Sequence, residues 1–215
     1  MESQINVWNA AHKRELGHKK EVHEEVKPLP ELFKVSGVKK ILDLGCGAGR
    51  HLVYFSQRGF TMSGLDFAAE AIRQSQEWLA EQGLSAELIC NDMIRLPWAD
   101  DIFDAVISIQ SLEHNELSSI QKIIGEVHRV LRDGSFFFAV VKKYPPRKDW
   151  KKGKFTELDS HLYAPTEGPE KGIVHYFFTE GELHDMLTGF TINRIEEDKK
   201  QRHYCFLAQK VVTGA

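Results

Sequence analysis

The chain has 215 residues, of which 42% are hydrophobic and 27% are charged, and its formal net charge is −3. This composition is that of an ordinary globular protein, and the length fits one domain with a substantial core. The slight acidity excludes the overall positive field that drives non-specific nucleic-acid binding. Three dispersed cysteines form no CxxC pair, which argues against a disulfide framework or a structural zinc site and suits a reducing compartment.

No basic region followed by an apolar run opens the chain, and the longest apolar run, 136–141, is far too short for a bilayer. We therefore expect a cytoplasmic protein with no membrane attachment. Residues 1–36 are polar and helix-prone, and prolines at 28 and 30 interrupt the pattern. This segment predicts either a helix packed on the domain or a lid that closes over a site, in which case Trp8 would contact a substrate.

From residue 38 onward, strand and helix patterns alternate. Strands are predicted at 41–44, 60–65, 86–90, 103–109 and 135–141, and helices at 48–57, 68–82 and 118–131. Ser118 or Ser119 is the expected N-cap of the last of these helices. Such alternation implies right-handed crossovers and an α/β fold, with a doubly wound, mostly parallel sheet covered by helices on both faces.

The alternation breaks at residues 142–178, where prolines and glycines predict a long irregular loop inserted into the domain. Thr179 and Glu182 then form a capping-box pattern at the start of a helix predicted at 180–187. Two closing strands with no helix between them, at 190–195 and 203–211, predict an antiparallel hairpin at one sheet edge. The whole chain, 1–215, is thus predicted to be a single domain.

Polar residues follow the first three predicted strands, at the edge where an open parallel sheet binds its ligands. Alternating glycines from Gly45 to Gly49 follow the first strand, and they let a ligand approach the backbone closely. Asp66 ends the second strand, where a carboxylate suits the two hydroxyls of a ribose. Asp92 follows the third strand and could accept a hydrogen bond from the exocyclic amine of adenine. These positions describe a nucleoside-bearing cofactor.

Two common nucleotide sites do not fit the glycine turn. A dinucleotide site requires G-x-G-x-x-G, and Arg50 stands where the third glycine or an alanine belongs. A mononucleotide P-loop requires Gly-Lys-Ser/Thr, which does not follow here.

Four stretches resemble the successive motifs of class I S-adenosylmethionine-dependent methyltransferases. They are Asp43-Leu44-Gly45-Cys46-Gly47-Ala48-Gly49, Asp66, Asn91-Asp92-Met93 and Phe103-Asp104-Ala105-Val106. The resemblance covers roughly residues 38–141 closely and the final hairpin in outline. It implies a Rossmann-like sheet of seven strands, the last antiparallel. It also implies methyl transfer from S-adenosyl-L-methionine to give S-adenosyl-L-homocysteine (EC 2.1.1.-), with no metal expected.

The resemblance also implies a set of cofactor contacts. By position they are Asp43, Gly45, Cys46, Gly47, Gly49, Asp66, Phe67, Asp92, Met93 and Gln110. The glycine turn would face the methionine part of the cofactor, with Asp43 near its amino end. Phe67 and Met93 would sandwich the base, and Gln110 would lie by the methionine ammonium and the transferable methyl. Cys46 fits as a small turn residue and has nothing beside it that would activate a thiolate.

Candidate acceptor residues follow the fourth strand and fill the predicted loop. His114, Tyr144 and His175 are candidate catalytic groups, and His161, Tyr163 and Arg202 are candidate substrate contacts. Residues 161–172 with 175–179 resemble a small-molecule subset of the family, the tellurite-resistance and thiol-methylating kind. The alternative is that these aromatic residues simply pack the loop onto the sheet.

A dense lysine run at 142–154 leaves three functions open. We expect a small-molecule acceptor, with the run solvated or facing an anionic substrate, and we expect nucleic acid to be an unlikely partner and the protein to be a monomer or a homodimer. The alternatives are an RNA or protein methyltransferase that docks through the lysines, or a non-catalytic module that binds S-adenosylmethionine and regulates a partner.

Overall fold

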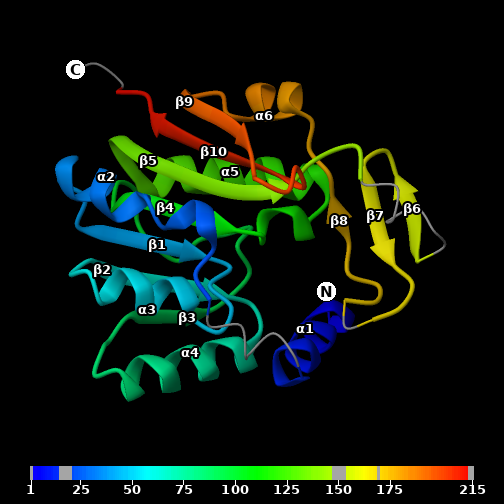
Figure 1. The fold of residues 1–215 in the computed structure, drawn as a ribbon, viewed down its shortest axis with the longest axis horizontal. Helices are drawn as coiled ribbons and strands as arrows, with labels where there is room; N and C mark the ends of the chain where they lie inside the picture. The colour runs from blue at the N-terminus through cyan, green and yellow to red at the C-terminus, as the bar shows by residue number, and fades with distance from the viewer. Residues whose placement is uncertain (1, 15–20, 147–153, 169, 213–215) are drawn as a thin grey trace.

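A seven-stranded sheet in the order β3-β2-β1-β4-β5-β10-β9 organises the protein. The computed structural model describes residues 2–14, 21–146, 154–168 and 170–212 (Figure 1). The strands are β1 Lys40–Leu44, β2 Thr61–Asp66, β3 Glu87–Cys90, β4 Phe103–Ile109, β5 Leu131–Lys142, β9 Phe190–Glu197 and β10 His203–Lys210. β1 to β5 run parallel, and β10 pairs antiparallel with both β5 and β9. The predicted fold class is therefore confirmed, as is the closing hairpin at the sheet edge.

Helices cover both faces of this sheet (Figure 1). They are α1 Glu2–Arg14, α2 Leu29–Val35, α3 Arg50–Ser56, α4 Ala69–Glu81, α5 Leu117–Val130 and α6 Glu180–Met186, with 3₁₀ turns η2 Glu24–Val26 and η3 Leu112–His114. Alternating strand residues feed two cores, so that Ile41 packs with α2, α3 and α4 while Leu42 packs with α5 and α6. No helix in the described ranges is both long and apolar enough to cross a membrane.

The N-termini of three helices can be compared with the starts predicted from the sequence. The capping box at Thr179 and Glu182 is confirmed, with both of its hydrogen bonds present. The predicted serine cap of α5 is wrong, because the helix begins one residue earlier and Glu116 stands at the N-cap without a side-chain bond. Pro28 and Pro30 start α2 rather than end a helix, as expected where a missing amide hydrogen costs nothing.

The predicted irregular connection at 142–178 is wrong in part, because it contains a second sheet. β6 Phe155–Asp159, β7 Leu162–Pro165 and β8 His175–Tyr176 form a three-stranded antiparallel sheet in that order. Figure 1 shows this small sheet and α1 on the side of the molecule toward which β1 and β5 point. Both therefore lie at the carboxyl edge of the large sheet, where the sequence predicts the ligand site.

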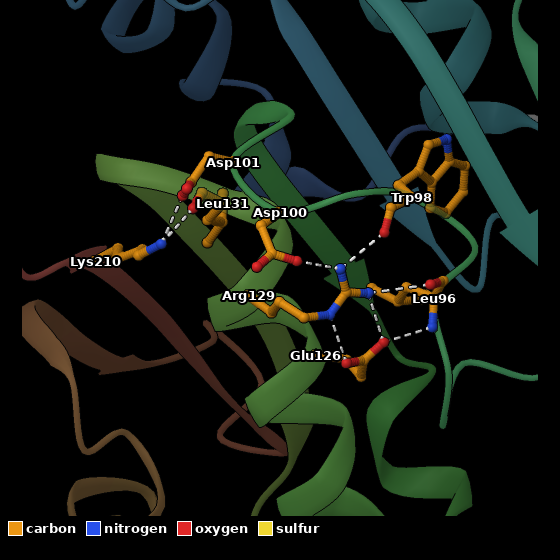
Figure 2. A network of polar contacts seen from close by, with 8 residues as sticks. All are labelled: Leu96, Trp98, Asp100, Asp101, Glu126, Arg129, Leu131 and Lys210. Atoms are coloured by element: carbon orange, nitrogen blue, oxygen red, sulfur yellow. Dashed lines mark hydrogen bonds and ion pairs between the residues drawn. The ribbon is translucent and has the colours of Figure 1, made fainter.

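At the opposite edge, where β4 and β5 begin, ion pairs connect neighbouring segments (Figure 2). Arg129 of α5 forms an ion pair with Glu126 and donates to the carbonyl of Trp98 at 2.8 Å. Lys210 at the end of β10 is buried, and its ammonium pairs with Asp101 at 2.8 Å. These contacts fix the connection between β3 and β4 to α5 and to the last strand.

Candidate active site

The glycine turn after β1 has the backbone that its sequence requires. Gly45, Gly47 and Gly49 all have positive φ, at 78°, 54° and 90°, a region that costs a side chain about 1–2 kcal/mol. A Cβ on Gly45 would also lie 2.4 Å from the Ser111 side chain, whose hydroxyl donates to the Gly45 carbonyl at 3.1 Å. The turn is therefore packed tightly from behind and open toward the carboxyl edge.

A cavity of about 280 Å³ opens at this turn. Its walls come from α1, the turns after β1, β2, β3 and β4, and the end of β5. The lining residues are Trp8, His12, Gly45, Cys46, Gly47, Ala48, Arg50, His51, Asp66, Phe67, Met93, Ile109, Gln110, Ser111, His114, Lys142 and Glu170. Nine of the residues predicted for the site are thus brought together: Trp8, Gly45, Cys46, Gly47, Asp66, Phe67, Met93, Gln110 and His114.

Asp66 holds the glycine turn against the end of β2. One of its oxygens accepts from the Gly47 amide and the other from the Ala68 amide, both at 2.9 Å. Burial raises the pKa of this carboxyl, although these two backbone bonds and the nearby His12 oppose the rise. Each carboxylate oxygen keeps a second lone pair, so Asp66 can still accept from a ligand hydroxyl in the cavity.

Asp43 lies behind the turn and does not line the cavity. Its carboxyl is buried and makes no hydrogen bond to a described residue. Burial raises its pKa to about 7, which Arg50 opposes and Asp66 reinforces. Burial also raises the pKa of the Cys46 thiol, so this cysteine is a neutral residue of the turn.

Two side chains suited to a flat ring face the same cavity, Phe67 after β2 and Met93 after β3. Asp92 is half-buried and is not a lining residue. Its carboxylate accepts from the Ile94 amide at 2.9 Å and so stabilises the turn after β3. Gly49, the N-cap of α3, also lies outside the lining, with Ser75 packed where its Cβ would be.

The far end of the cavity holds a cluster of ionisable groups. The His114 ring lies edge-on to the Trp8 ring at 4.8 Å and to the His175 ring at 4.6 Å between centroids. His175 faces the Glu170 carboxylate, with its Nε2 3.3 Å from Oε2. Burial lowers the pKa of His114 well below the usual range, and His175 and Lys142 lower it further. Both histidines are therefore neutral near pH 7, because burial lowers the pKa of His175 as well.

Five predicted acceptor residues do not line the cavity: His175, which contacts the His114 ring, and four others. The Tyr144 and His161 rings are tilted against each other at 4.0 Å, and His161 pairs with Glu182 at 3.0 Å. Tyr163 is buried and donates to Glu157, while Arg202 is exposed at the β9–β10 turn. These four residues pack within the second sheet and the hairpin and do not line the cavity.

Sequence reasoning missed other lining residues. They are His12, Ala48, Arg50, His51, Ile109, Ser111, Lys142 and Glu170. Arg50 stands out in the sequence only as a departure from the dinucleotide pattern. Lys142 is hidden in a lysine run, and Glu170 reaches the site only through the fold of the second sheet. The one available signal was position, since Ser111 and Lys142 each follow or end a predicted strand at the carboxyl edge.

Among the described residues, no group of three or more His, Cys, Asp or Glu side chains is arranged to hold a metal ion.

Comparison with known proteins agrees with this architecture. Residues 41–134 match the family model of the methyltransferase domain. An uncharacterized methyltransferase of Synechocystis is 33% identical over 114 residues, covering 51% of this chain and 50% of that protein. Norajmaline N-methyltransferase of Rauvolfia serpentina is 32% identical over 100 residues, covering 45% and 34%. The chain thus spans half the length or less of these curated relatives.

Solved structures share the fold at low identity. The PH0226 protein of Pyrococcus horikoshii superposes with a TM-score of 0.77 at 21% identity, over 93% of this chain and 97% of that one. A Burkholderia thailandensis N1-methyltransferase, solved with S-adenosylhomocysteine, has a TM-score of 0.70 at 20% identity, over 96% and 85%. TehB of Haemophilus influenzae has a TM-score of 0.66 at 17% identity, over 95% and 67%.

The strand order, the glycine turn and the cavity at the carboxyl edge define a class I methyltransferase fold. Residues 41–134 match the methyltransferase domain, and the described fold is shared with S-adenosylmethionine-dependent methyltransferases.

Proposed function

We propose that the protein transfers a methyl group from S-adenosyl-L-methionine to a small-molecule acceptor. One observation carries the proposal: a single cavity joins the glycine turn and Asp66 to the His114 cluster. The first end offers backbone and a carboxylate to a nucleoside-bearing ligand, and the second end offers neutral imidazole. Donor and acceptor would therefore meet inside one cavity, where an in-line displacement can be aligned.

Each part of the cofactor has a candidate partner. Asp66 would accept from the ribose hydroxyls, Phe67 and Met93 would contact the base, and Gly45 to Gly47 would pass along the methionine chain. We keep Asp92 as a candidate for the adenine amine, although its side chain now caps a turn. Asp43 and Gly49 would support the turn from behind. S-adenosylmethionine supplies a methyl group that its sulfonium already activates.

His114 is the candidate base in this proposal. Its Nδ1 lies 3.3 Å from the carbonyl oxygen of Val174 and would donate to it, which leaves Nε2 unprotonated. A neutral histidine with a lowered pKa is a weak base, so it would accept a proton only from an acceptor that becomes acidic as the new bond forms. Glu170 would stabilise the resulting charge, since its carboxylate favours the protonated form of His114. His175 would hold Glu170 in place.

The charges at this end favour an uncharged acceptor. The pKa of Glu170 is about 2, held low by His175 and His114 against the effect of burial. Its negative charge offsets the positive charge of Lys142, and Trp8 adds an apolar surface. Norajmaline N-methyltransferase and the Burkholderia N1-methyltransferase act on small molecules by name. Tyr144, His161, Tyr163 and Arg202 would matter only through the packing of the neighbouring segments.

Two other functions stay as alternatives. Docking of RNA or protein through the 142–154 lysines concerns a stretch of which 147–153 lies outside the described residues. A regulatory module would bind the cofactor without turnover. Within the proposal, residues 1–215 form one domain, 1–36 act as a lid or a packing segment whose α1 lines the cavity, and 142–178 supply the acceptor side.

Calorimetric titration with S-adenosylhomocysteine tests the cofactor half of the proposal. The wild-type protein should bind it, and Asp66→Ala should abolish binding. Asp185→Ala, an exposed aspartate of α6, is the matched control and should bind as the wild type does. Retained micromolar affinity in Asp66→Ala, with an unchanged melting temperature, would remove the ribose role. A labelled-methyl screen of amines, heteroaromatics, thiols, oxyanions and carboxylates then tests turnover, and turnover on RNA alone would overturn the small-molecule acceptor.

A further inference from the structure

Gln110 follows β4 directly and lines the cavity in an uncommon conformation. Its φ is 58°, which side chains rarely adopt, and its amide hydrogen is bonded to the Val140 carbonyl at 2.9 Å. Its side-chain Nε2 lies 3.0 Å from Nε2 of His203, which is 93 residues away in the sequence. Strained backbone persists where surrounding contacts hold it, and such positions gather at functional sites.

His203 is itself held by a short turn between β9 and β10. Its Nδ1 lies 2.9 Å from one carboxylate oxygen of Asp198. The other oxygen of Asp198 accepts from the Arg202 amide at 2.7 Å and the His203 amide at 3.4 Å. The side chains of His203 and Asp198 are only 12% and 9% exposed. A buried carboxylate with this many bonds is part of a built arrangement.

The chain of contacts fixes the proton positions on His203. An ionised carboxylate only accepts, so Nδ1 of His203 carries the hydrogen that points to Asp198. In the neutral ring Nε2 is then an acceptor, and the group of Gln110 that faces it must be the amide nitrogen. The carbonyl oxygen of Gln110 is left as the other end of the amide. No described residue donates a hydrogen bond to that oxygen.

We propose that Asp198 and His203 are positioning residues that orient the Gln110 amide, so that its carbonyl oxygen is presented to a ligand N–H group in the cavity. The ligand class is a cationic amine, such as the ammonium at the aminoacyl end of S-adenosylmethionine. The inference rests on the proposed function and adds two residues that line no part of the cavity. A protonated His203 would instead donate from Nε2, and the amide would turn its nitrogen outward and repel an ammonium group.

The surroundings of His203 favour its neutral form. Burial lowers its pKa most strongly, while Asp198 opposes this effect. Two cations lower the pKa of His203 further: Lys142, which pairs with His203 on the neighbouring strand β5, and Arg202, the preceding residue. The ring of His23, from the N-terminal segment, lies 6.4 Å from the His203 ring between centroids. His23 is also neutral, since burial lowers its pKa to about 4.

Two ligands that differ only at the aminoacyl end provide the test. S-adenosylhomocysteine carries the ammonium and carboxylate, and 5′-methylthioadenosine lacks both. Titration calorimetry is carried out with the full chain and with His203→Phe, which keeps an aromatic ring on β10 but removes the acceptor nitrogen. Asp198→Asn retains acceptors for the turn amides and lets His203 take either tautomer. Lys200→Gln changes an exposed charge in the same turn and is the control.

His203→Phe should bind S-adenosylhomocysteine about tenfold more weakly, as expected for a lost hydrogen bond to a charged group. Asp198→Asn should show a smaller loss, and neither variant should change the affinity for methylthioadenosine. Nitrogen-15 spectra of the wild-type imidazole should show an unprotonated Nε2 on His203, which needs no variant to fold.

Three results would overturn the inference. Equal loss for both ligands would mean that the hairpin only supports the fold, and unchanged affinity for both would mean that Gln110 needs no positioning. Protonation of His203 at Nε2 in the free protein would reverse the assigned amide orientation. If the wild type binds neither ligand, the proposed function fails first and the inference with it, whereas wild-type binding with unaffected variants removes the inference alone.

Discussion

Glu113, the residue before His114, is a fully buried carboxyl without a hydrogen bond to a described residue. Burial raises its pKa from the ordinary 4.5 to about 7, although Lys142 opposes the rise. Each pH unit between these values corresponds to about 1.4 kcal/mol, so ionising Glu113 in the folded protein costs roughly 3 kcal/mol. This cost is the quantity that Glu113→Gln should remove.

The sign follows from proton binding. Between pH 4.5 and about 7 the folded protein keeps the Glu113 proton and the unfolded chain releases it. Rising pH therefore favours the unfolded chain, and the free energy of unfolding falls over this window and then levels off. Glu113→Gln carries no such proton. From pH 5 to pH 8.5 the wild type should lose roughly 2 to 3 kcal/mol more stability than the variant does.

Urea unfolding at these two pH values, followed by circular dichroism, measures the difference. Asp43 also titrates near 7, but both proteins carry it, so its contribution cancels. Glu116→Gln, an exposed neighbour at the start of α5, should keep the wild-type pH dependence. If Glu113→Gln loses as much stability as the wild type over this range, Glu113 is ionised and paired in the folded protein, and the argument is refuted.

Two further predictions concern local structure. Thr179→Ala removes the hydroxyl that accepts from the Glu182 amide and should cost about 1 kcal/mol, seen as a melting temperature lower by roughly 2–4 °C; an unchanged value would mean the cap contributes nothing. Gly45→Ala should lower stability and abolish S-adenosylhomocysteine binding, because its Cβ would lie 2.4 Å from Ser111. Gly83→Ala is the control, because Gly83 has a φ of 65° with open space around it, so this variant shows only the backbone cost of a side chain at positive φ. An equal loss of stability in both variants would contradict the role of crowding at Gly45.

The sequence predicts well what is decided within a few residues. The alternating patterns place the strands of the large sheet, because each period reflects which face is buried. The capping box at Thr179 is similarly local. Asp66 is predictable because a residue that ends a parallel strand must lie at the binding edge. The α5 start escapes the same reasoning, since Ser118 is a good cap by type, yet the helix begins at Leu117 with Glu116 at its N-cap.

Contacts between segments far apart in the chain cannot be predicted from such local patterns. Nothing in the residues near Gln110 indicates that His203 will hold its side chain. Glu170 reaches the cavity only because the second sheet folds over the carboxyl edge. The sequence places these aromatic residues together in 142–178, but their packing partners, such as Glu182 for His161, lie in other elements. Spacing predicts which edge a residue reaches, not which neighbour it meets there.

Some buried charges of the sheet are paired and others are not. At the amino edge, Lys210 is buried and its charge is paired. At the carboxyl edge, Asp43 and Glu113 are buried without a hydrogen-bond partner among the described residues, and burial holds the pKa of each at about 7. Unpaired buried carboxyls cost stability, so a fold keeps them where they serve the site.

Each of these carboxyls lies beside a cation that lines the cavity, Asp43 beside Arg50 and Glu113 beside Lys142. Fully ionised carboxylates would cancel those two charges. Because burial keeps both carboxyls partly protonated near pH 7, Arg50 keeps more of its field for whatever occupies the cavity, while the charge of Lys142 is offset by Glu170 instead. The stability that the protein loses as Glu113 ionises at higher pH is therefore the cost of placing carboxyls behind the cavity walls, where they influence its charge.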